Sequence, residues 1–134
     1  MDIRTFKAFL KGRKEVPPVR TIAAGEAVFK LSRSRNRLFF SVAIRDINRV
    51  TQAHIHLGRR GENGPVVAFL FGPSKFGISV TRGVIRGALT RHDLVGPLSG
   101  KTILDLVDEI KSGNAYVNVH TVQNPDGEIR GQIL

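Results

Sequence analysis

The chain has 134 residues and no cysteine, which allows one domain with its own core and excludes disulfides, thiolate chemistry and cysteine-type zinc sites. Its formal charge is +10, and residues 1–60 hold fourteen of the 21 basic residues but four of the 11 acidic ones. Such an asymmetry suits an anionic partner or a basic, solubilising surface. We favour the latter, because no aromatic residues are interleaved with the basic ones in the sequence and no nucleic-acid motif occurs.

No apolar run approaches the length of a membrane span, and the first residues lack the apolar stretch of a secretory signal. We therefore expect a soluble protein, cytoplasmic as written. No linker or low-complexity tract divides the sequence, so we expect residues 1–134 to form a single domain.

Alternating or wholly apolar segments predict short strands, and one segment shows helical periodicity. The expected strands are residues 3–10, 25–31, 38–44, 50–57, 66–71, 79–89, 116–122 and 128–134. The expected helix is residues 102–112, ending before Gly113, and residues 90–93 resemble a capping box that opens a short turn. Pro17 and Pro18 place an extended loop after the first strand.

The spacing of these elements predicts the fold class. Short strands separated by regular turns, with one short helix, indicate an all-β protein built as an antiparallel β-sandwich or flattened barrel, immunoglobulin-like or like Cu/Zn superoxide dismutase. Two hairpins are expected, one over residues 32–37 and one over the Asn-Pro-Asp-Gly turn at residues 124–127. One short sequence recurs in two strands, as Ile85-Arg86-Gly87 and Ile129-Arg130-Gly131, and we expect both arginines to pair with nearby carboxylates.

Three histidines lie in alternating segments. Residues 52–57 and 116–121 each place their apolar side chains on the core side, so His54, His56 and His120 should lie on the opposite, outer face. If the two strands are neighbours, three imidazoles can meet at one ion with bonds of about 2.0–2.1 Å. Neutral imidazoles suit zinc or copper, and binding should weaken below pH of about 6.5, where an ordinary imidazole becomes protonated.

A metal site of this kind needs groups that orient the rings. We expect backbone carbonyls together with Asn118, Tyr116, Asp126 or Glu128 to do so. The alternative is a polar surface on which the histidines bond loop backbone beneath the turn at residues 59–65. His92 lies in the capped turn, and we interpret it as a surface residue.

Several longer motifs resemble the chordin domain (CHRD) family from about residue 6 to residue 134. They are Glu-Val-Pro-Pro-Val at 15–19, Ala-His-Ile-His at 53–56, Asn-Gly-Pro-Val-Val at 63–67, Asp-Leu-Val-Gly-Pro-Leu at 93–98, Gly-Asn-Ala-Tyr-Val-Asn-Val-His-Thr at 113–121 and Asn-Pro-Asp-Gly-Glu-Ile-Arg-Gly at 124–131. The family is named for repeats in chordin, an extracellular antagonist of bone morphogenetic proteins. It also occurs singly in microbial proteins, many of them exported, and the resemblance implies no established biochemical activity.

The His-x-His strand with a distant histidine also resembles the copper ligands of Cu/Zn superoxide dismutase. We place no counterpart here of that family's bridging histidine or zinc ligands, so dismutase activity is not implied. Our interpretation is a non-enzymatic binding module of the CHRD type with a transition metal on His54, His56 and His120. One alternative is a copper- or zinc-dependent enzyme. The other is an envelope or adhesion protein whose basic first half binds an anionic polymer; a protein partner is also open.

Overall fold

Seven strands and one α-helix account for the ordered elements that the computed structural model describes, which covers residues 4–75 and 77–134. The expected start of the first strand at Ile3 lies outside these residues. The strands are β1 (Thr5–Lys11), β2 (Ala24–Leu31), β3 (Leu38–Leu57), β4 (Val66–Phe71), β5 (Ile78–Leu89), β6 (Ala115–Thr121) and β7 (Ile129–Gln132). The helix is α1 (Ile103–Lys111), and three short 3-10 turns are η1 (Gly12–Lys14), η2 (Arg91–Asp93) and η3 (Gly96–Leu98).

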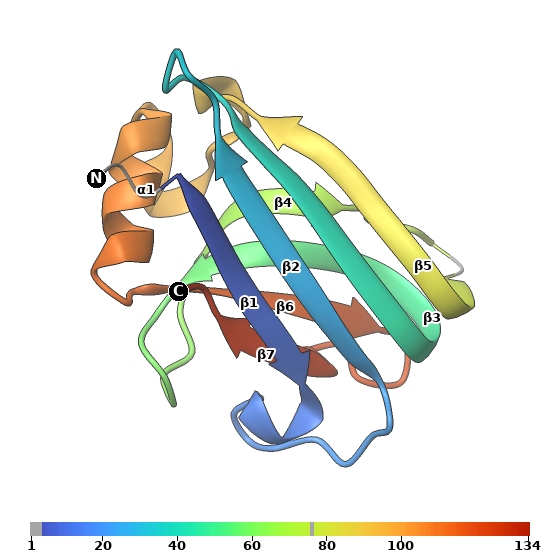
Figure 1. The fold of residues 1–134 in the computed structure, drawn as a ribbon. Helices are drawn as coiled ribbons and strands as arrows, with labels where there is room; N and C mark the ends of the chain where they lie inside the picture. The colour runs from blue at the N-terminus through green and yellow to red at the C-terminus, as the bar shows by residue number, and fades with distance from the viewer. Residues whose placement is uncertain (1–3, 76) are drawn as a thin grey trace.

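Five of the strands close a barrel. The order β2-β1-β7-β6-β3 returns on itself because β3 also pairs with β2, while β4 and β5 extend the sheet from β3 (Figure 1). Every strand pair is antiparallel, and the expected hairpins β2–β3 and β6–β7 both form. The predicted fold class, an all-β flattened barrel with one short helix, is confirmed.

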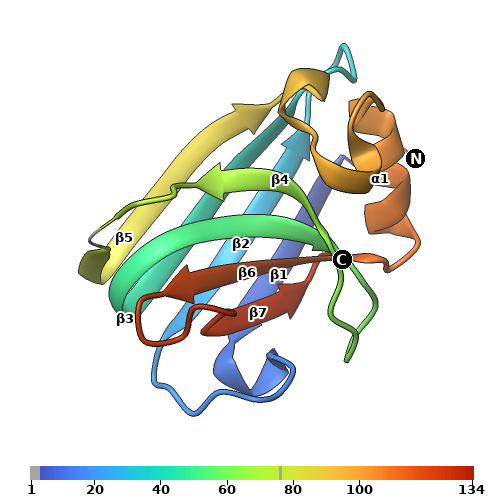
Figure 2. The same cartoon turned by 180° about the vertical axis from the view of Figure 1, so that it is seen from behind.

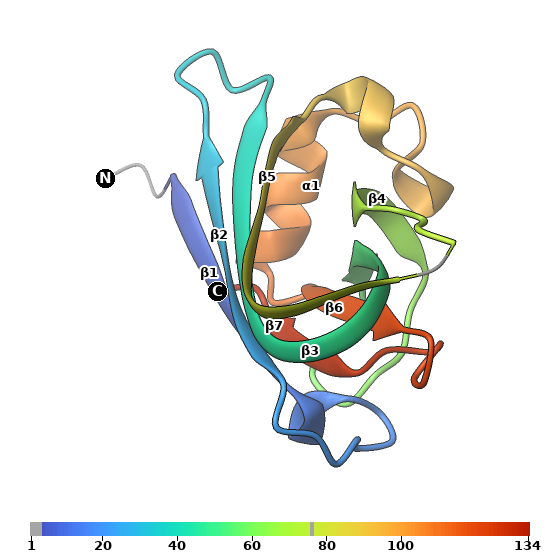
Figure 3. The same cartoon turned by 90° about the vertical axis from the view of Figure 1, so that its right-hand side faces the viewer.

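The strand β3 is a single element of 20 residues, and its two halves pair with different strands of the barrel. Its first half pairs with β2 and β5, and its second half pairs with β6 and β4. Between them the chain bends at Asp46 and Arg49, whose φ angles are 53° and 57° (Figure 3). Our prediction of separate strands at 38–44 and 50–57 was wrong, because β5 keeps pairing through Ile47 and Val50 across the bend.

The helix α1 forms where its periodicity predicts it. Thr102 Oγ1 accepts from the Asp105 backbone N–H at 3.2 Å, and the Asp105 carboxylate accepts from the Thr102 backbone N–H at 2.9 Å. The same reciprocal cap joins Thr90 and Asp93 at η2, as expected. The apolar face of α1 is buried in the core through Ile103, Leu106, Val107 and Ile110. Among the described residues, no helix combines the length and the apolar character needed to cross a membrane.

Candidate metal centre

The structure brings the three histidines together. His54 and His56 come from the second half of β3, and His120 comes from β6, the strand that pairs with it (Figure 2). His54 lies opposite Asn118 in the register, two residues from His120, so the rings meet diagonally across the strand pair. One nitrogen from each ring lies within 4.8 Å of the other two. Nitrogens bound to one tetrahedral zinc ion are roughly 3.3 Å apart, so a small inward shift of the rings would complete such a site.

The histidine face is buried, whereas the sequence led us to expect it on the outside. His54, His56 and His120 are 3%, 8% and 8% exposed, and all seven residues of β6 are buried. Two loops fold back over this face, residues 58–65 after β3 and residues 122–128 after β6, and the Phe69 ring packs edge-on against His54 at 4.5 Å. The strand alternation gave the correct side of the sheet, but only the loops decide that this side is shielded from water.

Hydrogen bonds fix the proton on each ring. His120 Nδ1 lies 2.7 Å from the Pro125 carbonyl oxygen, and His56 Nδ1 lies 2.8 Å from the Gly64 carbonyl oxygen. Since a carbonyl oxygen only accepts, both Nδ1 atoms donate, and in the neutral form of each ring the lone pair is then on Nε2. His54 Nε2 lies 3.0 Å from Gln52 Oε1, and a ring that donates to this oxygen has its lone pair on Nδ1. The unprotonated nitrogens are therefore the three that point at one another.

This arrangement concentrates lone pairs at one point. His54 Nδ1 lies 3.1 Å from His120 Nε2, and Asn118 Oδ1 lies 3.0 Å from the same His120 nitrogen. His56 Nε2 is buried and has no hydrogen-bond partner in the described chain. An unpaired buried acceptor is costly, and facing lone pairs repel unless a cation lies between them. A proton on His120 Nε2 would satisfy His54 Nδ1 and Asn118 Oδ1 but not His56 Nε2, whereas an ion shared by the three rings would satisfy all three nitrogens.

Burial also holds two of the rings neutral. Burial, and then the neighbouring His120 and His56 rings, lower the pKa of His54 to about 3. Burial lowers the pKa of His56 too, although its bond to the Gly64 carbonyl opposes the change. Neutral imidazole is the form that binds a metal, so His54 stays competent as a ligand well below the pH of about 6.5 expected for an ordinary histidine.

The residues expected to orient the rings divide into two groups. Asn118 contacts His120, and Tyr116 stacks on His56 with ring centroids 4.8 Å apart and planes 6° from parallel. The Tyr116 hydroxyl accepts from the Gly64 backbone N–H at 3.1 Å, which fixes the carbonyl that bonds His56. Asp126 is exposed, and the Glu128 carboxylate accepts bonds from Thr21, Thr121, Gln123 and Asn124 and from no histidine in the described chain.

Gln52 and Glu15 of this polar region had no role in the sequence analysis, and Arg130 was expected only to pair with a carboxylate. Gln52 lies two positions before His54 on the same face of β3, so the strand alternation already carried that signal. Glu15 is 5% exposed, and Arg130 is 2% exposed with its guanidinium carbon 3.5 Å from the centre of the Tyr116 ring. No spacing in the sequence links these two to the histidines. Arg130 donates to Asn63 and to two backbone carbonyls, and its charge also acts to lower the pKa of the Glu15 carboxyl.

The titration of Glu15 provides a test of how completely water is excluded from this region. Burial raises the pKa of its carboxyl to about 7, although Arg130 and the hydrogen bond with Asn118 both act in the opposite direction. A raised carboxyl pKa contributes stability that is present below the unfolded value of about 4.5 and is lost as the pH rises through about 7.

We therefore expect Glu15→Gln to be more stable than the parent chain at pH of about 8.5, by on the order of 1–3 kcal/mol, and to match it at pH of about 5. Urea unfolding at the two pH values measures the difference, with Glu26→Gln at a half-buried position as the control. A Glu15→Gln chain that is less stable than the parent at the higher pH would show that Arg130 needs the carboxylate as its counter-charge.

The comparisons with known proteins give one match. The family model of the CHRD domain matches residues 6–133, which is nearly the whole chain. No curated protein and no solved structure matches the sequence or the fold.

Proposed function

This chain belongs to the CHRD domain family, and we propose that it is a non-enzymatic binding module that holds one zinc or copper ion through His54, His56 and His120. The ligand atoms are His54 Nδ1, His56 Nε2 and His120 Nε2. The ion joins β3 to β6 and links the loops at 58–65 and 122–128 to the same centre, since a carbonyl of each loop bonds a ligating ring.

One observation carries the proposal. Each ring has its N–H directed at an oxygen acceptor and its lone pair directed at the other two rings, with His54 Nδ1 and His120 Nε2 only 3.1 Å apart. Metal-ligating histidines generally donate their second nitrogen in this way, which orients the ring and strengthens the ligand. The alternative expected from the sequence, histidines that merely bond loop backbone, explains the outer nitrogens but leaves His56 Nε2 without a partner.

Burial of the rings favours a binding module over a metal-dependent enzyme. A catalytic metal keeps a coordination position open to substrate, normally within a concave pocket. The histidines are at most 8% exposed, and the pocket of about 800 Å³ on the surface is lined by none of them. An ion here would be enclosed by protein, which is the arrangement of a structural site.

Titration calorimetry with zinc tests the proposal directly. We expect one ion per chain and no specific binding by His120→Ala, while His92→Ala, which removes an exposed histidine from η2, binds as the parent does. Zinc binding that survives unchanged in His120→Ala, or is lost in His92→Ala, would contradict the proposed ligand set.

A further inference from the structure

The basic side chains on the outer side of one sheet region lie in rows that cross its strands. This region consists of β1, β2, the first half of β3, and β5. Pairing across the four strands aligns their outward residues in rows, which we call together the basic sheet face. The rows are Thr5–Lys30–Phe39–Ala88, Lys7–Val28–Ser41–Arg86, Phe9–Glu26–Ala43–Val84 and Lys11–Ala24–Arg45–Arg82. Six cations, all exposed, share these rows with one acidic residue, Glu26.

Aromatic side chains lie among these cations. Phe9 is 56% exposed and Phe39 is 45% exposed, which is unusual for large apolar residues on a sheet face. From the sequence we took the charge for a solubilising surface, although Phe9 lies between Lys7 and Lys11 in the chain. Strand alternation keeps Phe9 and both lysines on one face of β1. The register between strands adds Lys30 beside Phe39, and it aligns Arg45 and Arg82 with Lys11. Arg82 and Arg86 also show that the basic surface is not confined to the first half of the chain.

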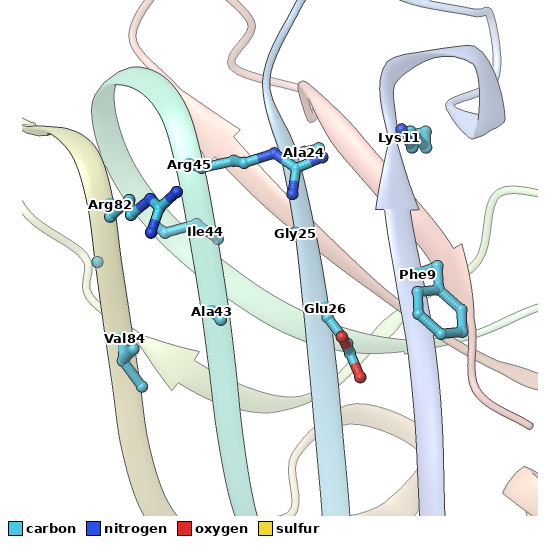
Figure 4. A pocket seen from close by; sticks show the side chains of 11 residues that line it. Phe9, Lys11, Ala24, Gly25, Glu26, Ala43, Ile44, Arg45, Arg82 and Val84 are labelled. Atoms are coloured by element: carbon cyan, nitrogen blue, oxygen red, sulfur yellow. The ribbon is translucent and has the colours of Figure 1, made fainter.

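A shallow pocket of about 800 Å³ lies on this face (Figure 4). Its floor is made by small residues, among them Ala24, Gly25, Ala43 and Gly83, so a flat group can approach the backbone of the sheet. Figure 4 shows Arg82 and Arg45 reaching over the strands at one end, with Glu26 and Phe9 on the neighbouring strands β2 and β1. The pocket thus has a cationic row beside a second row in which Phe9, Ala43 and Val84 are apolar and Glu26 is acidic.

The segregation of these rows indicates what the face binds. The cationic row of Lys11, Arg45 and Arg82 and the row of Phe9 and Val84 are two residues apart along the strands, or about 6.7 Å. A nucleotide has the same division, with its anion at one end and its flat ring at the other. Arginine recognises phosphate with paired donors, exposed aromatic rings stack on bases, and a carboxylate such as that of Glu26 accepts from the amino group of a base.

We propose that the basic sheet face binds single-stranded nucleic acid, with the backbone phosphates on Lys11, Arg45 and Arg82 and the bases over Phe9 and the bare floor of the pocket. A duplex hides the faces of its bases from Phe9. A sulfated or carboxylated polysaccharide carries its anions around each sugar ring and does not match the division between the rows. This face contains none of the three histidines, so the proposal stands or fails independently of the metal centre.

Fluorescence anisotropy with a labelled thymidine oligonucleotide of about twelve residues tests the proposal on the full chain at about 50 mM salt. We expect the double variant Arg45→Gln with Arg82→Gln to weaken binding at least about tenfold. It should also reduce by about 1.4 the steepness with which the logarithm of the binding constant falls with the logarithm of the salt concentration. Phe9→Ala should weaken it about 5- to 100-fold, through loss of stacking. Arg91→Gln with Lys101→Gln removes the same charge from another part of the surface and is the control for the arginine variant. Ile22→Ala removes exposed apolar surface elsewhere and is the control for Phe9→Ala. Both controls should change the affinity less than about twofold.

Competition with other polyanions tests whether the basic sheet face recognises bases or only negative charge. Inorganic polyphosphate, which has no rings, should compete weakly, and its own binding should be insensitive to Phe9→Ala. The proposal is overturned if the oligonucleotide does not bind, if Phe9→Ala binds it as the parent does, or if a duplex of the same length binds as tightly. Tighter binding of heparin, unaffected by Phe9→Ala, would overturn it in favour of an anionic polysaccharide.

Discussion

Saturating zinc is expected to raise the melting temperature of the metal-free protein by about 10–15 °C. An ion present at a thousand times its dissociation constant stabilises the folded chain by about 4 kcal/mol, and a domain of this size gains roughly 3 °C for each kcal/mol. The physical source is the cluster of lone pairs at His54 Nδ1, His56 Nε2 and His120 Nε2, which an ion converts from a repulsive contact into three bonds. Differential scanning calorimetry with zinc and with copper measures the shift.

Histidine variants connect this shift to the proposed ligands. His54→Ala and His120→Ala should each abolish it, and circular dichroism establishes that each variant is folded before the metal is added. His92→Ala is the matched control, because that side chain is exposed in η2 and should leave the shift intact. If a folded parent chain shows no change in melting temperature with any first-row transition metal, the metal centre does not exist.

Arg130→Met is expected to destabilise the protein by about 3–5 kcal/mol. The guanidinium is 2% exposed, lies 3.5 Å from the centre of the Tyr116 ring, and donates to Asn63 Oδ1 at 2.9 Å and to the Arg59 carbonyl at 3.2 Å. It also donates to the Glu62 carbonyl. Methionine keeps most of the volume but leaves these acceptors without their donor. The loop at 58–65 should then detach from β7, and with it the Gly64 carbonyl that orients His56.

The repeated tripeptide supplies the control for this prediction. Arg86 occurs in the same Ile-Arg-Gly sequence as Arg130, but its side chain is exposed on β5. Arg86→Met should therefore change the free energy of unfolding by no more than about 0.5 kcal/mol. Urea titrations of both variants give the comparison. A loss below about 1 kcal/mol for Arg130→Met would mean that water replaces the guanidinium and that the loop does not depend on it.

The two arginines illustrate why identical local sequence leads to different roles. Both lie between an isoleucine and a glycine in strands with similar alternation, so sequence patterns treat them alike. Arg130 differs because the loop at 58–65, whose Asn63 is 67 residues away in the chain, folds over β7 and surrounds it with acceptors. Arg86 has no such cover. Whether a polar side chain is buried depends on which distant segment packs on it, and that information is not contained in strand periodicity.

The sequence by itself determined the features that local physics controls. Alternation placed His54, His56 and His120 on one side of their strands, threonine and aspartate at the right spacing capped α1, and the turn residues at 124–127 formed the β6–β7 hairpin. These follow from side-chain period and hydrogen bonds within a few residues, which a single strand or turn already specifies.

Tertiary structure alone decided the rest. The bend at Asp46 and Arg49 lets β3 pair with strands on both sides of the barrel, and loops close over the histidine face. The register of β1, β2, β3 and β5 brings Arg45 and Arg82 into one row with Lys11, next to the row of Phe9. Each of these depends on contacts between segments far apart in the chain. Such contacts are fixed by the packing of the whole core, so no short stretch of sequence contains them.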